Sequence, residues 1–232
     1  MTAPTTPAAP ITPQRTLADL AASHAGASRV FYRHGLDFCC HGQVSMAEAC
    51  AKKQIDVAGL VRELEAEMRA PGGGGEFVRW DERPIADLIE HILERFHAAH
   101  RAELPRLLEM AHRVDKVHAD KPTCPKGLAE HLEHVAEALE MHMQKEEQIL
   151  FPLLKSTRAH MAAMPIQVME EEHDDHGRNL RRIRELTNDL VPPPEACGTW
   201  KALYLGLADL EEQVMQHIHL ENNVLFPRAL RR

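Results

Sequence analysis

The sequence has few aromatic residues, no long apolar run and no excess of basic charge. The last two shortages each exclude a class of partner. Of its 232 residues only two are Trp, two Tyr and six Phe. No apolar run approaches the roughly 18 residues of a membrane-spanning helix, and the first residues lack the pattern of a secretory signal. The net charge is -8, whereas nucleic-acid-binding surfaces are normally basic. We therefore expect neither a membrane nor a nucleic acid as partner.

Cysteine is also scarce, and its arrangement does not suggest disulfides. There are five cysteines, an odd number, and Cys39 and Cys40 are adjacent. Disulfide frameworks usually show an even number of separated cysteines, so we expect a reducing compartment, the cytoplasm. Histidine, with 16 residues, is abundant instead. Many histidines beside few aromatics indicate metal chemistry.

Helix-breaking residues divide the first third of the chain. Residues 1–14, rich in Pro, Thr and Ala, predict a disordered tail. Residues 15–70 predict a small helical domain, in which one helix runs from Thr16 to Gly35 and Ser45 caps the next one. Residues 71–83 predict a flexible linker, because their four consecutive glycines sustain neither a helix nor a strand.

The remaining residues, 84–232, predict a bundle of four long helices. These are expected over residues 85–117, 126–156, 165–188 and 197–229. Pro105 is expected to interrupt or kink the first, and no segment alternates as a strand would. The fold class is therefore all-α, with a four-helix bundle preceded by the small helical domain.

Two of these helices carry the same motif, His-x3-Glu-x3-Leu-Phe-Pro. It begins at His142 with Glu146, and again at His217 with Glu221. Residues four apart lie on one face of a helix, so each pair presents an imidazole and a carboxylate to one point. A single pair of this kind is commonly a surface feature. Two copies predict a shared interior site for two metal ions, with each glutamate free to bridge them. The prolines are expected to kink or end their helices.

The other two helices must supply further ligands to complete such a site. His97 lies in an apolar stripe of the first helix, and His173 stands out in an acidic stretch of the third. His118 ends the first helix, where a histidine often only complements the helix dipole. Mixed imidazole and carboxylate ligands favour Fe, Mn or Zn, and a bridged pair in a bundle favours iron.

Together with several longer motifs, these residues resemble a known family. Residues 84–230 resemble a hemerythrin-like domain, and the chain from Thr16 onward resembles the di-iron proteins that repair iron–sulfur clusters (RIC, ScdA/YtfE-like). The resemblance rests on Asp37 to Cys40, Arg95 to His97, Val117 to Pro122, His142 to Pro152, Val168 to His173, Pro192 to Cys197 and His217 to Pro227.

The resemblance implies two non-haem iron ions, carboxylate-bridged, and leaves open whether an oxo group also joins them. The implied ligands are His97, His118, His142, His173 and His217, with Glu146 and Glu221 as bridges. It implies that His176 and His219 are not ligands. The family's small domain usually reads Cys-Cys-Gly-Gly, whereas His41 follows Cys40 here. We expect His41 either to change the acidity of the thiols or to add a ligand.

The function implied is repair of iron–sulfur clusters damaged by oxidative or nitrosative stress, with iron supplied by the bundle and transfer assisted by Cys39 and Cys40. The expected partners are damaged iron–sulfur proteins, NO or O2 as small ligands, and a second copy of the chain in a homodimer. Two alternatives stay open: a di-iron NO reductase or peroxidase, and a hemerythrin-type protein that binds O2 or NO. Whether the chain is an enzyme is open for the same reason.

Overall fold

Helices make up the regular structure of the chain. The computed structural model describes residues 10–69, 77–156 and 158–231. In these ranges the only β-type pairing is an isolated bridge between Thr16 and Ser45, which confirms the predicted all-α class. None of the helices found there has the length and apolar character needed to cross a membrane. The chain forms two compact units, one comprising residues up to 84 with 218–227, the other 85–217 with 228–232.

Over residues 10–69 the first unit contains four short helices. They are α1 (Leu17–Ser23), α2 (Ala27–Arg33), α3 (Met46–Lys53) and α4 (Val57–Arg69). The Thr16 side chain caps α1, and Ser45 and Glu48 form the predicted capping box on α3. The helix expected from Thr16 to Gly35 is divided in two, because Gly26 adopts a left-handed conformation with φ of 76°. Glycine reaches that region without steric cost.

Two predicted segments fall partly outside the described residues. Residues 1–9 of the predicted tail and residues 71–76 of the predicted linker lie there. The rest of the tail contains no helix, but the Pro13 carbonyl accepts a hydrogen bond of 2.9 Å from the Ala47 backbone. That bond holds the end of the predicted tail at the first turn of α3.

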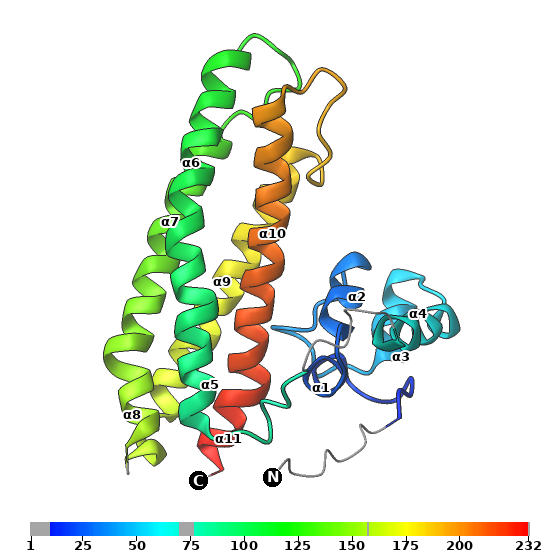
Figure 1. Ribbon diagram of the computed structural model, residues 1–232, viewed down its shortest axis with the longest axis vertical. Helices are drawn as coiled ribbons and strands as arrows, with labels where there is room; N and C mark the ends of the chain where they lie inside the picture. Colours follow the sequence, from blue (N-terminus) through cyan, green and yellow to red (C-terminus); the bar gives the residue numbers. More distant parts are fainter. Residues whose placement is uncertain (1–9, 70–76, 157, 232) are drawn as a thin grey trace. The chain divides into compact units, whose positions relative to one another are not determined.

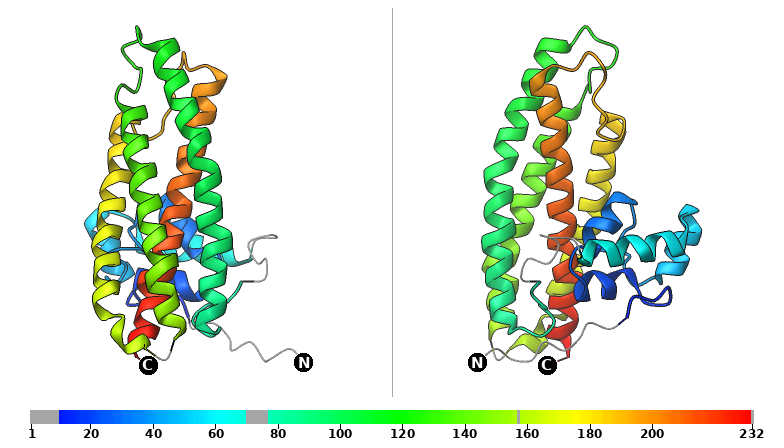
Figure 2. Two further views of the ribbon diagram at one scale, coloured as in Figure 1. Left: turned by 90° about the vertical axis from the view of Figure 1, so that its left-hand side faces the viewer. Right: turned by 45° about the vertical axis from the view of Figure 1, so that its right-hand side comes forward.

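The second unit is a bundle of long helices. Its elements are α5 (Ile85–Ile92), η1 (Leu93–His97), α6 (Ala98–His118), α7 (Leu128–Lys145), η2 (Glu146–Leu150), α8 (Phe151–Lys155), η3 (Ala159–Met161), α9 (Ala163–Thr187) and most of α10 (Gly198–Leu220). Figures 1 and 2 show α6, α7, α9 and α10 running alongside one another. Leu107, Leu132, Leu139 and Leu203 are among the side chains buried between them. This agrees with the predicted four-helix bundle.

Three helices contain a single wider, π-helical turn. These turns are η1, η2 and η4 (Glu221–Leu225), and α11 (Phe226–Leu230) follows the last. The backbone N–H of Phe151 bonds to the Glu146 carbonyl five residues back, and that of Phe226 bonds to Glu221 in the same way. A proline follows each phenylalanine and offers no N–H to an α-helical ladder. The helices therefore widen locally and continue. At Pro105 the sequence predicted an interruption or a kink; α6 runs through this residue without an interruption, and the kink stays a prediction.

Candidate metal centre

Each wide turn carries at least one of the candidate ligands. His97 is the last residue of η1, Glu146 is the first of η2 and Glu221 is the first of η4. Such turns leave the regular hydrogen-bond ladder of a helix and occur frequently at functional sites. The local backbone thus departs from the α-helix where the sequence motif places its chemistry.

His97, His217 and Glu146 form the first group of ligand atoms. All three side chains are at most 1% exposed. The Nε2 atoms of His97 and His217 lie 3.3 Å apart. Glu146 Oε2 lies 3.3 Å from His97 Nε2 and 4.0 Å from His217 Nε2. Three helices therefore bring two imidazoles and a carboxylate oxygen together in the bundle interior.

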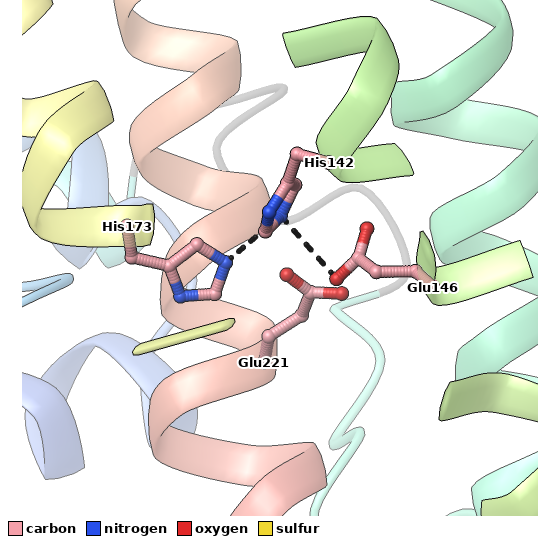
Figure 3. Close-up of side chains that lie close together, drawn as sticks. All are labelled: His142, Glu146, His173 and Glu221. Atoms are coloured by element: carbon pink, nitrogen blue, oxygen red, sulfur yellow. Dashed lines mark hydrogen bonds and ion pairs between the residues drawn. The ribbon is translucent and has the colours of Figure 1, made fainter. Parts of the chain in front are cut away.

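His142 and His173 form the second group, and Glu146 joins it with its other oxygen. The Nε2 atoms of the two histidines lie 3.1 Å apart, and Glu146 Oε1 lies 3.4 Å from His142 Nε2. The helix that carries η4 continues α10 without a break, so Glu221 follows His217 by one turn. Figure 3 shows these four side chains pointing to a common centre, and each offers a ligand atom within 4.8 Å of the others.

Two further carboxylates orient the histidines. Glu147 accepts a hydrogen bond from His97 Nδ1 at 2.8 Å, and Glu172 accepts one from His142 Nδ1 at 2.9 Å. An ionised carboxylate only accepts, so in each case Nδ1 carries the proton and Nε2 presents its lone pair to the centre. This arrangement is typical of metal-binding histidines.

The same contacts keep both carboxylates ionised. The hydrogen bond from His142 lowers the pKa of Glu172 to about 2, against the effect of partial burial, and Lys145 adds to the lowering. Burial acts to raise the pKa of Glu147, but hydrogen bonds from Arg101 and His97 outweigh it and the pKa is lowered. Each Nδ1–H therefore has an ionised carboxylate as its acceptor.

The donor set fits a metal ion. Lone pairs on the Nε2 atoms of His97 and His142 each face another imidazole nitrogen at 3.3 and 3.1 Å, together with a fully buried carboxylate. Neighbouring lone pairs and a buried negative charge are stabilised when a cation binds among them. Imidazole nitrogen and carboxylate oxygen suit Fe, Mn or Zn better than Ca.

The structure does not bring His118 to these groups. It ends α6, whose 21 residues begin directly after His97, so about 30 Å of helix separates the two histidines. His118 Nε2 instead lies 3.3 Å from Cys197 Sγ. We therefore remove His118 from the predicted ligand set. It matches the family motif in sequence, but it lies at the end of α6 that is remote from His97.

Four further groups surround the ligands, and sequence reasoning passed over two of them. Glu147 and Glu172 were missed, although each stands beside a predicted ligand in the sequence. His100 and His176, each three residues after a predicted ligand, are buried beside the rings of His217 and His142. Burial lowers the pKa of His100 to about 2. These two rings are thus neutral and pack around the centre.

The predicted cysteines lie in a tight turn of the first unit. The Sγ atoms of Cys39 and Cys40 are 3.6 Å apart, and Asp37 Oδ1 accepts hydrogen bonds from the backbone N–H of both and from the thiol of Cys39. The hydrogen bond with Cys40, together with burial, raises the pKa of Cys39. His41 Nδ1 lies 2.8 Å from Asp37 Oδ2, so its ring contacts the aspartate that also binds the Cys39 thiol. Asp37, Cys39 and Cys40 together could also hold a metal ion.

The residues that follow Glu221 hold this cysteine turn in place. Asn223 Nδ2 donates to the carbonyl oxygens of Cys39 and Phe38, at 3.0 and 3.2 Å. Asn222 donates to the Cys39 carbonyl at 3.3 Å. His219 is buried, with Nδ1 3.2 Å from the Phe38 carbonyl, and this contact gives it a role outside the ligand set. The cysteine turn is thus attached to the helical segment that carries Glu221.

Two family models match separate parts of this chain. The hemerythrin HHE cation binding domain model matches residues 88–229, and the ScdA_N model, a domain of unknown function, matches residues 13–68. Proteins named iron-sulfur cluster repair protein YtfE from Citrobacter koseri and Escherichia coli O157:H7 are each 47% identical over 214 residues, which is 92% of this chain and 96% of each relative. That of Pectobacterium atrosepticum is 46% identical over 217 residues, 94% of this chain and 97% of the relative.

Proposed function

The chain belongs to the hemerythrin HHE cation-binding family and, over most of its length, to the iron–sulfur cluster repair proteins, and we propose that it repairs clusters damaged by oxidative or nitrosative stress by supplying iron. The acceptor is a protein whose iron–sulfur cluster has lost iron. The compartment is the reducing cytoplasm, which agrees with the free state of all five cysteines.

The observation that carries a two-iron site is the position of Glu146. Its two oxygens point to different histidine pairs, Oε2 to His97 and His217, and Oε1 to His142. One carboxylate between two pairs of imidazoles is the arrangement expected of a bridging ligand. We assign His97, His217 and Glu146 to one iron, and His142, His173, Glu146 and Glu221 to the other.

The protein's own groups prepare this site for holding and releasing iron. Bound iron supplies a redox-active, Lewis-acidic centre that takes small ligands such as NO or O2. Glu147 and Glu172 hold the proton on Nδ1 of His97 and His142, so those rings bind through Nε2 alone. Burial of the ligands excludes water and slows loss of the metal.

Cys39 and Cys40 are proposed to assist the transfer. Two thiolates bound to one tetrahedral ion at 2.3 Å would be about 3.8 Å apart, close to the observed 3.6 Å. Each thiol gives up its proton to water as it binds a cation. The thiols belong to the turn that Asn222 and Asn223 attach to the segment of Glu221.

Restoration of a damaged iron–sulfur enzyme tests the proposal. Iron-loaded protein is expected to restore the activity of an enzyme treated with NO or peroxide, and zinc-loaded protein is not. A variant with Cys39→Ser and Cys40→Ser should keep its iron but restore activity more slowly. Equal restoration by the zinc form would remove iron supply as the function. Steady consumption of NO with an electron donor, without restoration, would favour the NO reductase instead.

A further inference from the structure

His118 and Cys197 form a histidine–thiol pair at the end of the bundle remote from His97. His118 ends α6 and is 7% exposed, and its Nε2 lies 3.3 Å from the Sγ of Cys197. The ring rests on the fully buried indole of Trp200, with centroids 5.1 Å apart. Cys197 is exposed to solvent. A buried base thus contacts an accessible thiol, and neither residue takes part in the metal centre.

The backbone around Cys197 also favours a reactive thiol. The Cys197 carbonyl accepts a hydrogen bond of 3.0 Å from the N–H of Lys201, which places it at the N-cap of α10, a helix of 23 residues. The positive end of a helix dipole stabilises a thiolate, and so does a neighbouring histidine that takes the proton. The hydrogen bond of 2.5 Å from Thr123 to Glu195 joins the loop after His118 to the loop before Cys197.

A pocket begins at the residue after Cys197. It has a volume of about 390 Å³ and is lined by Gly198, Thr199 and Ala202 of α10 and by Arg106, Glu109, Met110 and Arg113 of α6. A pocket of that size accommodates a small organic molecule. Arg106 is paired with the carboxylate of Glu103, and Arg113 can bind a carboxylate of an anionic ligand. The pocket thus adjoins the histidine–thiol pair in the sequence of α10, and offers a place for a negatively charged reaction partner beside the thiol.

We propose that Cys197 and His118 form a thiol–disulfide exchange site for a small anionic disulfide of the glutathione type. His118 takes the proton of Cys197, and the thiolate attacks one sulfur of the disulfide. A bond forms between Cys197 Sγ and that sulfur while the original disulfide bond breaks. The leaving thiolate takes the proton from His118, so Cys197 ends in a mixed disulfide and one small thiol is released.

The experiment measures how fast Cys197 reacts in full-length, iron-loaded protein with Cys39→Ser and Cys40→Ser. The two remaining cysteines, Cys50 and Cys124, are buried, so Cys197 is the accessible thiol. Oxidised glutathione and neutral iodoacetamide are the two probes, and mass spectrometry identifies the modified residue. Cys197 is expected to react with both probes at least about tenfold faster than an unfolded peptide thiol at pH 7.

Matched variants then separate the effect of His118 on the reaction rate of Cys197 from the effect of the pocket. His118→Gln and His118→Phe should slow both probes about tenfold, whereas His112→Gln, an exposed histidine of the same helix, should change neither. Arg106→Ala with Arg113→Ala should slow oxidised glutathione and leave iodoacetamide unchanged. Thermal melts identify which His118 variant is folded, and two variants are used so that one can fail.

Several outcomes would overturn the proposal. One is a Cys197 that reacts no faster than the peptide thiol, and another is a folded His118 variant that reacts as fast as wild type. Loss of iron in a folded His118 variant would return this residue to the ligand set. The exchange site does not depend on the repair function, so failure of either leaves the other standing.

Discussion

Replacement of Glu146 by leucine separates the two roles that a buried carboxylate can have. In the structure Glu146 is fully buried, and its oxygens lie 3.3 and 3.4 Å from the Nε2 atoms of His97 and His142. If it bridges two irons, Glu146→Leu must reduce iron binding. If it only completes an ion-pair network with the histidines, Glu146→Leu must lower the stability of the metal-free protein.

The two cases predict changes in melting temperature that differ in sign as well as in size. Because Nε2 of His97 and of His142 presents a lone pair and not a proton to Glu146, Glu146→Leu takes away a buried negative charge without leaving an opposite charge behind, and burying a charge is costly. We therefore expect the metal-free variant to melt at or above the temperature of metal-free wild type. Iron bound at a free concentration about 1,000 times its Kd stabilises the folded state by roughly 4 kcal/mol. At roughly 2–4 °C per kcal/mol for a protein of this size, that is roughly 8–16 °C for each site.

The assay compares melting temperatures and iron content with and without anaerobic ferrous loading. Wild type should bind two irons and show the full rise in melting temperature, and Glu146→Leu should bind at most one and lose at least half of the rise. Glu137→Leu, an exposed position of α7, serves as the control and should behave as wild type. Two irons and an unchanged rise in Glu146→Leu would refute the bridge.

Three further changes test the metal centre, the cysteine turn and the ion pairs of the first unit. Glu147→Gln should weaken iron binding about 10–100-fold, because its amide no longer fixes the proton on His97 Nδ1; an iron titration with unchanged affinity would contradict this. Asn223→Ala should speed labelling of the Cys39 thiol, since the turn loses two hydrogen bonds, and an unchanged rate would show that the turn is held otherwise. Hydrogen bonds from Arg29 and then Arg33 lower the pKa of Glu67 below 4.5, so this carboxylate stabilises the first unit above pH 4.5 and less as the pH falls through its folded value. Glu67→Gln should therefore cost about 1 kcal/mol or less at pH 7, and denaturant melts should show that difference shrink as the pH falls below 4.5.

The sequence predicts the centre best where the chemistry depends on one helical turn. Spacing of four residues is enough to put His142 with Glu146 on one face, and the repetition of the motif indicates that two helices share a site. Placing His118 requires knowing how far α6 extends, and a matching motif says nothing about that distance. Glu147 was missed for a different reason: its role depends on a contact with His97 fifty positions earlier, which no local pattern contains.

The wide turn of η2 changes which face of the helix points into the bundle, so that different faces are buried before and after the turn. A regular helix would follow Glu146 with inward positions at 149, 150 and 153. Leu150 is buried, but Ile149 is 58% exposed, and Phe151 and Leu154 are buried as well. The one extra residue in the turn rotates everything after it by about 100°. Upstream of the turn the helix presents metal ligands, and downstream it presents an apolar surface. A one-residue deletion at Gln148 would therefore leave the ligand pair aligned and turn the apolar surface away from the core, so the length of this turn is fixed by packing as firmly as its ligands are fixed by chemistry.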